Sequence, residues 1–215
     1  MGFDESGHVL GTKVTFATER RTSMDKIDLG PQGFLYPMPM TLIGADLASD
    51  PSFMAAAWVI RCQPNPPRLV ACMGKAHATN AGIREHGQLS VCIPSVDQVE
   101  VTDWCGLKSA NRGFDKAAPF TVFRGSLEHA PMIAECPLCL ECRVHQTVDL
   151  GSHELFIADI VGTWTEARFL TADGKPDIVK LRPFVLTMPD NRYWAVGEHI
   201  ADAWSVGRAY GERNV

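Results

Sequence analysis

The sequence predicts a mainly β protein with short helices, whose strands close into a barrel. Three apolar runs, at residues 41–44, 55–62 and 68–73, follow one another closely and are separated by Pro and Gly. Short strands at this spacing favour a barrel over a parallel α/β sheet. No G-x-G-x-x-G motif follows any predicted strand. A separate dinucleotide-binding domain is therefore not expected.

Composition indicates a soluble globular domain. The 215 residues are 46% hydrophobic and 21% charged, with a net charge of -5 and a pI near 5.8. This acidic balance argues against nucleic-acid binding, and no apolar run approaches the ~18 residues of a membrane helix. The polar first residues, MGFDESGHVLGTK, do not resemble a secretory signal. The lack of a secretory signal and the odd count of seven cysteines together predict reduced thiols and a cytoplasmic location.

The first half of the chain contains most of the predicted strands. Residues 1–35 are expected to form an N-terminal arm with one strand at 14–18, and residues 36–215 one domain with a C-terminal extension. Pro37-Met38-Pro39 forces an extended approach to the strand at 41–44. Asp50-Pro51 predicts a turn, and the prolines at 64, 66 and 67 separate strand 55–62 from strand 68–73.

The second half alternates loops with longer strands. Residues 96–113 are rich in charge and Gly, and are expected to be irregular and to cover a site. Strands are predicted at 119–123, 138–148, 154–163 and 184–187, with a polar excursion at 168–180. A helix is expected around residues 199–206.

The stretch 74–95 carries the candidate binding residues. Lys75, His77 and Thr79 fall at every second position, so an extended chain would point all three side chains to one side. Thr79 or Asn80 is a good N-cap and Gly87 a good C-terminal residue, which predicts a helix at 80–86 and then a strand at 89–93. A cation, an imidazole and a hydroxyl beside a helix N-terminus favour a phosphate. The alternative is a solvated lysine, a surface histidine and a simple cap.

Several short motifs occur together in a characteristic order. They are Pro37-Met38-Pro39 with Leu42-Ile43-Gly44, Ala57-Trp58, Lys75 with His77 and Thr79, Ile93-Pro94-Ser95, Gly106 and Ser109 with Asp115 and Lys116, Ala130-Pro131, Leu140-Glu141-Cys142, and Trp194 with Gly197 and Glu198. In these motifs the chain resembles the flavin reductase-like, FMN-binding split-barrel family, and within it the flavoredoxin-like branch. The resemblance runs from about residue 36 to 208. It implies a split β-barrel of Greek-key type and a homodimer with FMN in a groove at the subunit interface.

The resemblance also implies roles for individual residues. Lys75, His77, Thr79 and Asn80 would hold the FMN phosphate. The main chain of Ala55, Ala56 and Ala57 would approach the isoalloxazine, and Trp58 would pack beside the ring or serve as a plain core aromatic. The remaining implied cofactor-binding residues are Cys92, Ile93, Pro94, Ser95, Gly106, Ser109 and Lys116. Cys92, Ala110 and Ala117 stand where the family usually has Asn, Gly and an aromatic residue.

The implied activity is an NAD(P)H-dependent flavin reductase. With no separate nucleotide-binding motif, NADH or NADPH would stack directly on the flavin, and hydride transfer would need no catalytic acid or base from the protein. The first alternative is a flavoredoxin-type FMN electron carrier that serves a redox partner protein without nicotinamide turnover. The second is a metal-binding or redox-sensing protein that uses its cysteines.

Cys136, Cys139 and Cys142 form a C-x2-C-x2-C run that invites a metal site. Gln146 stands where an iron–sulfur run would continue with Cys. Because residues 138–144 alternate like a strand, Cys139 and Cys142 should lie on opposite faces. We therefore expect no metal at this run.

Overall fold

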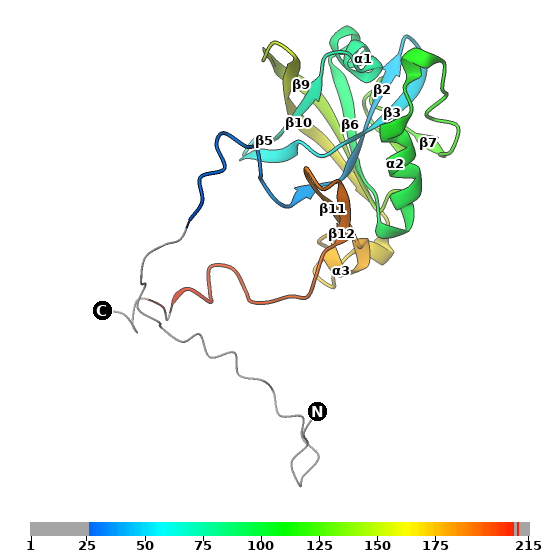
Figure 1. Cartoon of the computed structure of the whole chain (residues 1–215). Coiled ribbons are helices and arrows are strands. Elements are labelled where there is room, and N and C mark those ends of the chain that lie inside the picture. Colours follow the sequence, from blue (N-terminus) through cyan, green and yellow to red (C-terminus); the bar gives the residue numbers. More distant parts are fainter. Residues whose placement is uncertain (1–25, 209, 211–215) are drawn as a thin grey trace. The chain divides into compact units, whose positions relative to one another are not determined.

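The computed structural model describes residues 26–208 and Tyr210 (Figure 1). The chain divides after Gly33 into residues 1–33 and 34–215, and every helix and strand of the described part belongs to the second unit. The strand expected at 14–18 lies outside the described residues. The assignment of residues 1–35 to an arm and 36–215 to a domain stays a prediction.

A seven-stranded antiparallel sheet forms the centre of the second unit. Its order is β3-β2-β6-β9-β10-β5-β4. The strands are β2 (Thr41–Leu47), β3 (Asp50–Ala56), β4 (Val59–Pro64), β5 (Pro67–Gly74), β6 (Gln88–Ile93), β9 (Leu138–Asp149) and β10 (His153–Thr165). The predicted mainly β fold with short helices is confirmed.

Both faces of the sheet are buried, in two separate hydrophobic cores. Ile43, Met54 and Val91 pack in the first core. Their neighbours Leu42, Phe53 and Cys92 pack in the second core. Because successive strand residues point to opposite faces, burial of both faces explains why β2 reads as a continuous apolar run rather than an alternating one.

Smaller elements complete the unit. One small sheet has the order β1-β11-β12, and β7 pairs with β8. These strands are β1 (Met38–Pro39), β11 (Phe184–Thr187), β12 (Arg192–Ala195), β7 (Val122–Phe123) and β8 (Met132–Ile133). The helices are α1 (Ala78–His86), α2 (Val99–Leu107) and α3 (Ile178–Leu181), with short 3-10 turns at Val96–Gln98, Ala110–Arg112 and Ala167–Phe169. Helix α2 lies along β3, and α1 packs on β2 at the end of the sheet (Figure 1).

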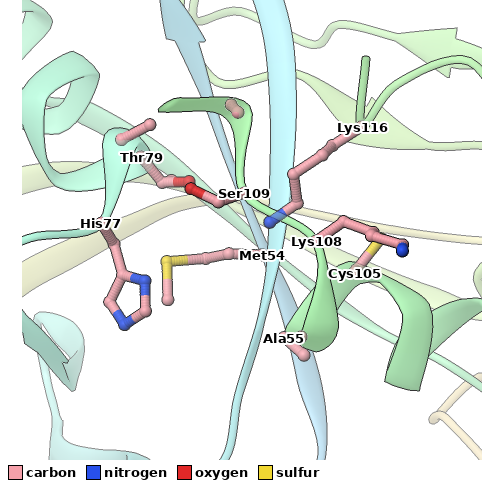
Figure 2. A pocket seen from close by; sticks show the side chains of 11 residues that line it. Met54, Ala55, His77, Thr79, Cys105, Lys108, Ser109 and Lys116 are labelled. Atoms are coloured by element: carbon pink, nitrogen blue, oxygen red, sulfur yellow. The ribbon is translucent and has the colours of Figure 1, made fainter. Parts of the chain in front are cut away.

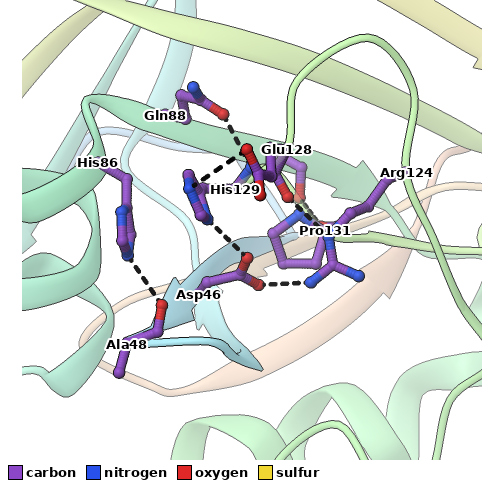
Figure 3. A network of polar contacts seen from close by, with 9 residues as sticks. Asp46, Ala48, His86, Gln88, Arg124, Glu128, His129 and Pro131 are labelled. Atoms are coloured by element: carbon purple, nitrogen blue, oxygen red, sulfur yellow. Dashed lines mark hydrogen bonds and ion pairs between the residues drawn. The ribbon is translucent and has the colours of Figure 1, made fainter.

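A polar network fixes α1 and the loop before β8 to the end of β2. The buried carboxylate of Asp46 accepts a hydrogen bond from Arg124 Nη2 at 2.8 Å, and its second oxygen lies 3.1 Å from His129 Nδ1 (Figure 3). The His129 ring stacks on that of His86, with centroids 3.9 Å apart. His86 Nε2 lies 3.1 Å from the carbonyl oxygen of Ala48. The network therefore fixes the end of α1 against the β2–β3 turn.

Two predictions between residues 48 and 64 were wrong. The turn lies at Ala48 and Ser49, and Asp50-Pro51 begins β3. Proline is tolerated there because β3 is an edge strand of the sheet. The strand predicted at 55–62 is divided between two elements, since β3 ends at Ala56 and β4 begins at Val59. The small residues that suggested one strand therefore lie where the chain leaves one edge of the sheet and crosses to the other.

Three further predictions need correction. Residues 96–113 are not irregular, since they contain α2, which begins beyond a capping box formed by Ser95 and Gln98. The strand predicted at 119–123 is limited to β7. The helix expected at 199–206 is absent from the described residues: 199–202 have no regular structure and 203–206 lie in turns. Its apolar residues stay exposed, Ile200 at 96% and Trp204 at 93%, so no packing stabilises a short helix there.

None of the helices in the described residues is long and apolar enough to cross a membrane.

Candidate functional site

A pocket opens where β3, the N-terminus of α1 and the C-terminal end of α2 meet (Figure 2). We call it the lysine pocket. Helix α2 lies close to β3 here. A Cβ atom added at Gly106 would be 3.4 Å from the Cβ of Ala55. The residues that line it are Met54, Ala55, His77, Ala78, Thr79, Cys105, Gly106, Lys108, Ser109, Ala110 and Lys116.

Lys116 is the most unusual group in the lysine pocket. The residue is only 6% exposed, and its amine extends into the pocket beside Ser109 (Figure 2). It makes no hydrogen bond or ion pair with any residue that the structure describes. Burial lowers the pKa of this amine, and the nearby Cys105 thiol opposes the shift. A buried ammonium group is costly unless it is paired, so this side chain is suited to an anionic ligand.

The N-terminus of α1 contributes backbone donors to the same pocket. His77 is the N-cap and makes no side-chain capping bond, and the first turn holds no acidic residue. Ala78 and Thr79, whose N–H groups lie in that turn, both line the pocket. Free N–H groups and the helix dipole favour an anion at this point.

Helix α1 is held in place by a carboxylate of β10. Glu154 Oε2 accepts hydrogen bonds from Asn80 Nδ2 at 3.0 Å and from Arg84 Nη1 at 2.5 Å. Asn80 is fully buried, and it lines neither pocket described here. Its contacts therefore give it a role in positioning the helix N-terminus.

A second pocket adjoins the first, and we call it the tryptophan pocket. It is lined by Met54, Ala55, Ala56, Ala57, Trp58, Cys72, Met73, Gly74, His77, His153, Leu186 and Met188. The ring of Trp58 lies 5.3 Å from that of His153, measured between centroids, and Trp58 is 47% exposed. Three residues line both pockets, namely Met54, Ala55 and His77. The two pockets are therefore adjacent and share these three residues as a common wall.

His77 stands at the junction of the two pockets. Burial, the charge of Lys116 and the proximity of His153 lower its pKa below the ordinary 6.5. The imidazole is therefore neutral at neutral pH. Nearby, burial raises the pKa of the Cys105 thiol to about 11, against the opposing effect of Lys116, which keeps Cys105 protonated.

The structure brings most of the sequence-predicted site residues together. Ala55, His77, Thr79, Gly106, Ser109 and Lys116 line the lysine pocket, and Ala55, Ala56, Ala57, Trp58 and His77 line the tryptophan pocket. Six others line neither pocket: Lys75, Asn80, Cys92, Ile93, Pro94 and Ser95.

Lys75 and Thr79 differ from the extended arrangement that the sequence suggested. Helix α1 begins at Ala78, so Thr79 belongs to its first turn, and His77 takes the capping position expected of Thr79 or Asn80. Lys75 forms an ion pair with Asp149 at the end of β9, with Nζ 2.6 Å from Oδ1. The alternation of Lys75, His77 and Thr79 required an extended chain, but strand β5 ends at Gly74, Lys75 and Ala76 form a turn, and α1 follows.

Sequence reasoning missed Lys108, Cys105 and His153. Lys108 and Cys105 come from the segment expected to be irregular, where recognition of the Ser95–Gln98 capping box would have located α2. His153 reaches the tryptophan pocket because β10 pairs with β5, which places it opposite Gly74. No local pattern indicates that pairing.

The donor sets of the two adjacent pockets together match a flavin mononucleotide. The lysine pocket offers a buried ammonium, two hydroxyl side chains and a helix N-terminus, which suit a phosphate monoester. The tryptophan pocket offers small side chains, three methionines and an indole, which suit a flat aromatic ring.

The comparisons with known proteins agree with this fit. Residues 34–176 match the flavin reductase like domain, and the chain belongs to that family of flavin-binding split-barrel proteins. It is similar in structure to the flavoredoxin of Methanosarcina acetivorans, with 43% identity over 87% of this chain and 100% of the other, and a TM-score of 0.84. The flavoredoxin of Desulfovibrio vulgaris (Miyazaki F) is 33% identical over 85% of this chain and 100% of its own, with a TM-score of 0.79. A relative from Bradyrhizobium diazoefficiens, named FMN reductase (NADH) RutF, is 22% identical over 62% of this chain and 76% of its own.

These findings confirm the predicted family and the split-barrel fold, and they support FMN as the cofactor.

Proposed function

We propose that the protein binds FMN with its phosphate in the lysine pocket and its isoalloxazine ring in the tryptophan pocket. The observation that carries this proposal is the adjacency of the two pockets, which share Met54, Ala55 and His77. The cationic lysine pocket suits the charged phosphate end of FMN, and the adjacent tryptophan pocket, lined by small residues, suits its flat aromatic ring.

Five features of the lysine pocket have roles in this proposal. The ammonium of Lys116 and the first N–H groups of α1 bind the phosphate oxygens, and the hydroxyls of Thr79 and Ser109 add neutral donors. His77, whose pKa is lowered, donates from a neutral ring. Hydrogen bonds to a charged group contribute about 1.5–3 kcal/mol each, so Lys116 has a large share of the binding free energy.

In the tryptophan pocket, shape matters more than charge. Ala55, Ala56 and Ala57 leave room for the ring to approach the main chain, and Trp58 and His153 form one wall. Bound flavin supplies the redox chemistry. The protein supplies orientation and a partly desolvated surface, and no side chain of the site is assigned as a catalytic acid or base.

We infer that the bound flavin is reduced by NADH or NADPH stacked on the exposed face of the ring. Membership of the flavin reductase-like family and the relative named FMN reductase (NADH) support this activity. The similarity to two flavoredoxins supports the second candidate, an FMN electron carrier that serves a redox partner protein.

A homodimer is part of the proposal. Trp58 is 47% and Ile60 67% exposed at the edge of the sheet formed by β4 and the loop before it, and a second copy would cover both. A cytoplasmic location is also proposed, since all seven cysteines are free thiols, as expected in a reducing compartment.

Anaerobic stopped-flow reduction separates the enzyme from the carrier. The FMN-loaded protein is mixed with NADH or with NADPH, and loss of the oxidised flavin absorbance is followed. We expect measurable reduction by at least one nucleotide, well below the diffusion limit. If neither nucleotide reduces the flavin although dithionite does so at once, the electron-carrier function replaces the reductase.

A further inference from the structure

The second core, on the side of the sheet that α2 covers, holds four buried thiols. One of them, Cys105, lines the lysine pocket. The other three are Cys92, Cys136 and Cys139, which are 0%, 6% and 1% exposed. None of these three lines the lysine pocket or the tryptophan pocket. The flavin site therefore leaves these thiols without an assigned role.

The strand register places two of these thiols directly opposite each other. Cys92 on β6 is the pairing partner of Cys139 on β9. Opposed residues of an antiparallel pair have Cα atoms about 4.5–5.5 Å apart, within the range of roughly 4.4–6.8 Å that a disulfide spans. No other two of the seven cysteines are paired in a strand register. Cys142 belongs to the first core, on the opposite face of β9, as the alternation in the sequence predicted.

Cys136 is the third member and the one nearest to solvent. It lies in the turn between β8 and β9, so the chain is not extended there, and its N–H donates to the carbonyl of Ile133 at 3.2 Å. Gln98 Nε2 lies 3.7 Å from its sulfur and donates to it. The thiol of Cys139 donates to the same Ile133 carbonyl at 3.4 Å. One backbone carbonyl thus holds Cys136 of the turn and Cys139 of β9 together.

We propose that Cys92, Cys136 and Cys139 form an oxidation site at which a hydroperoxide converts two thiols into a disulfide between Cys92 and Cys139. Cys136 receives the oxidant because it is the most exposed of the three. The strand register selects the final pair.

The steps balance as follows. The peroxide transfers one oxygen to the sulfur of Cys136, which is oxidised to a sulfenic acid while the peroxide O–O bond breaks and water leaves. The thiol of Cys139 attacks that sulfur, so an S–S bond forms, the S–O bond breaks and a second water carries away the thiol proton. Cys92 then attacks the sulfur of Cys139 and Cys136 leaves as a thiol with the proton of Cys92. Overall, two thiols and one hydrogen peroxide give one disulfide and two waters.

The surroundings make this reaction slow at neutral pH. Contact with the thiols of Cys139 and Cys92, together with burial, raises the pKa of Cys136. Burial opposes ionisation of Cys92, but hydrogen bonds with Cys136 and Cys139 lower the pKa of Cys92 overall. Since the thiolate is the nucleophile, oxidation should accelerate as the pH rises. Cys62 is exposed on β4, away from this core, and provides the internal comparison.

The test uses the full-length, reduced protein in native buffer with hydrogen peroxide. Remaining thiols are blocked with N-ethylmaleimide, and digested peptides are mapped by mass spectrometry. We expect a chain lighter by two hydrogens, a peptide that links Cys92 to Cys139, and full reversal by dithiothreitol. Cys139→Ala should abolish the linkage, Cys136→Ser should slow it severalfold, and Cys62→Ser should leave it unchanged.

Two results would overturn the proposal. The first is that Cys92, Cys136 and Cys139 still react with N-ethylmaleimide after the peroxide-treated protein is unfolded, although Cys62 in the same sample has been oxidised. The three thiols would then serve only as packing residues. The second is a linkage that omits Cys92. The wild-type map decides between these outcomes even if Cys139→Ala fails to fold, and neither outcome depends on flavin binding.

Discussion

At the scale of single residues, two lysines are candidates for binding the FMN phosphate. Lys75 stands in the phosphate-binding motif, but its amine is bound to Asp149 at 2.6 Å on the protein surface. Lys116 lies further along the chain, is buried, and has no anionic partner among the described residues. An exposed ion pair contributes little, whereas a buried amine gains strongly from a phosphate. Lys116 is therefore expected to bind FMN more strongly than Lys75.

Replacing each lysine by glutamine tests this order. Lys116→Gln should weaken FMN binding by about 1.5–3 kcal/mol, which is roughly 10- to 150-fold in Kd, and should barely change riboflavin binding. Lys75→Gln is the matched control, with a smaller loss for FMN. Titration of both ligands with both variants gives the comparison. A larger loss of FMN affinity for Lys75→Gln than for Lys116→Gln would contradict this order and would assign the phosphate contact to Lys75, as the sequence first suggested.

His77 gives the site a pH dependence. The pKa of its imidazole is lowered in the folded protein by burial, Lys116 and His153. The imidazole therefore binds a proton more tightly in the unfolded chain than in the folded protein. Stability therefore falls as the pH drops below about 6.5, the ordinary pKa of the group. His77→Gln should reduce that loss, measured as the unfolding midpoint from pH 8 to 5 at steps of roughly one unit. Equal pH dependence in the two proteins would contradict this account of His77.

At the scale of elements, the position of α1 determines the phosphate site. Glu154 binds Asn80 and Arg84 on one side of the helix. On the other side Gly82 packs directly on β2, and a Cβ added there would overlap the backbone carbonyl of Asp46. The absence of a side chain at Gly82 thus lets the helix approach the sheet closely.

Gly82→Ala should therefore push α1 away from β2. We expect a loss of about 1–3 kcal/mol in the free energy of unfolding, together with weaker FMN binding because the helix N-terminus moves. Gly207→Ala is the control, since no atom lies within 4 Å of the added Cβ. Denaturant unfolding of both variants provides the measurement. An unchanged stability for Gly82→Ala would show that the helix has room to shift.

The elements also show where sequence reasoning succeeds. The strands at 68–73, 89–93, 138–148 and 184–187 were predicted within a residue or two, because each has a distinct apolar pattern and a clear Pro or Gly boundary. Helix α2 was missed because its start is marked by the side chains of Ser95 and Gln98 rather than by a periodic apolar face. The break at Ala57-Trp58 was missed because small residues fit a strand and a crossover equally well.

At the scale of the whole molecule, the site is assembled by long-range pairing. His153 meets the tryptophan pocket through the register of β10 with β5, and Lys116 meets the lysine pocket from a loop beyond α2. Local pattern cannot supply either contact, because each depends on residues far apart in the chain. The resemblance to the family indicated Lys116 but not His153, and neither residue's partners were evident from the sequence.

The most direct test of the central claim is a titration of the purified, flavin-free protein with FMN and with riboflavin. The lysine pocket should make FMN bind at least tenfold more tightly than riboflavin, since its phosphate gains about 1.5 kcal/mol or more from charge-assisted hydrogen bonds. Quenching of flavin fluorescence, or calorimetry, measures both affinities. No binding of FMN in large excess, or equal affinity for the two ligands, would contradict the assignment of the two pockets.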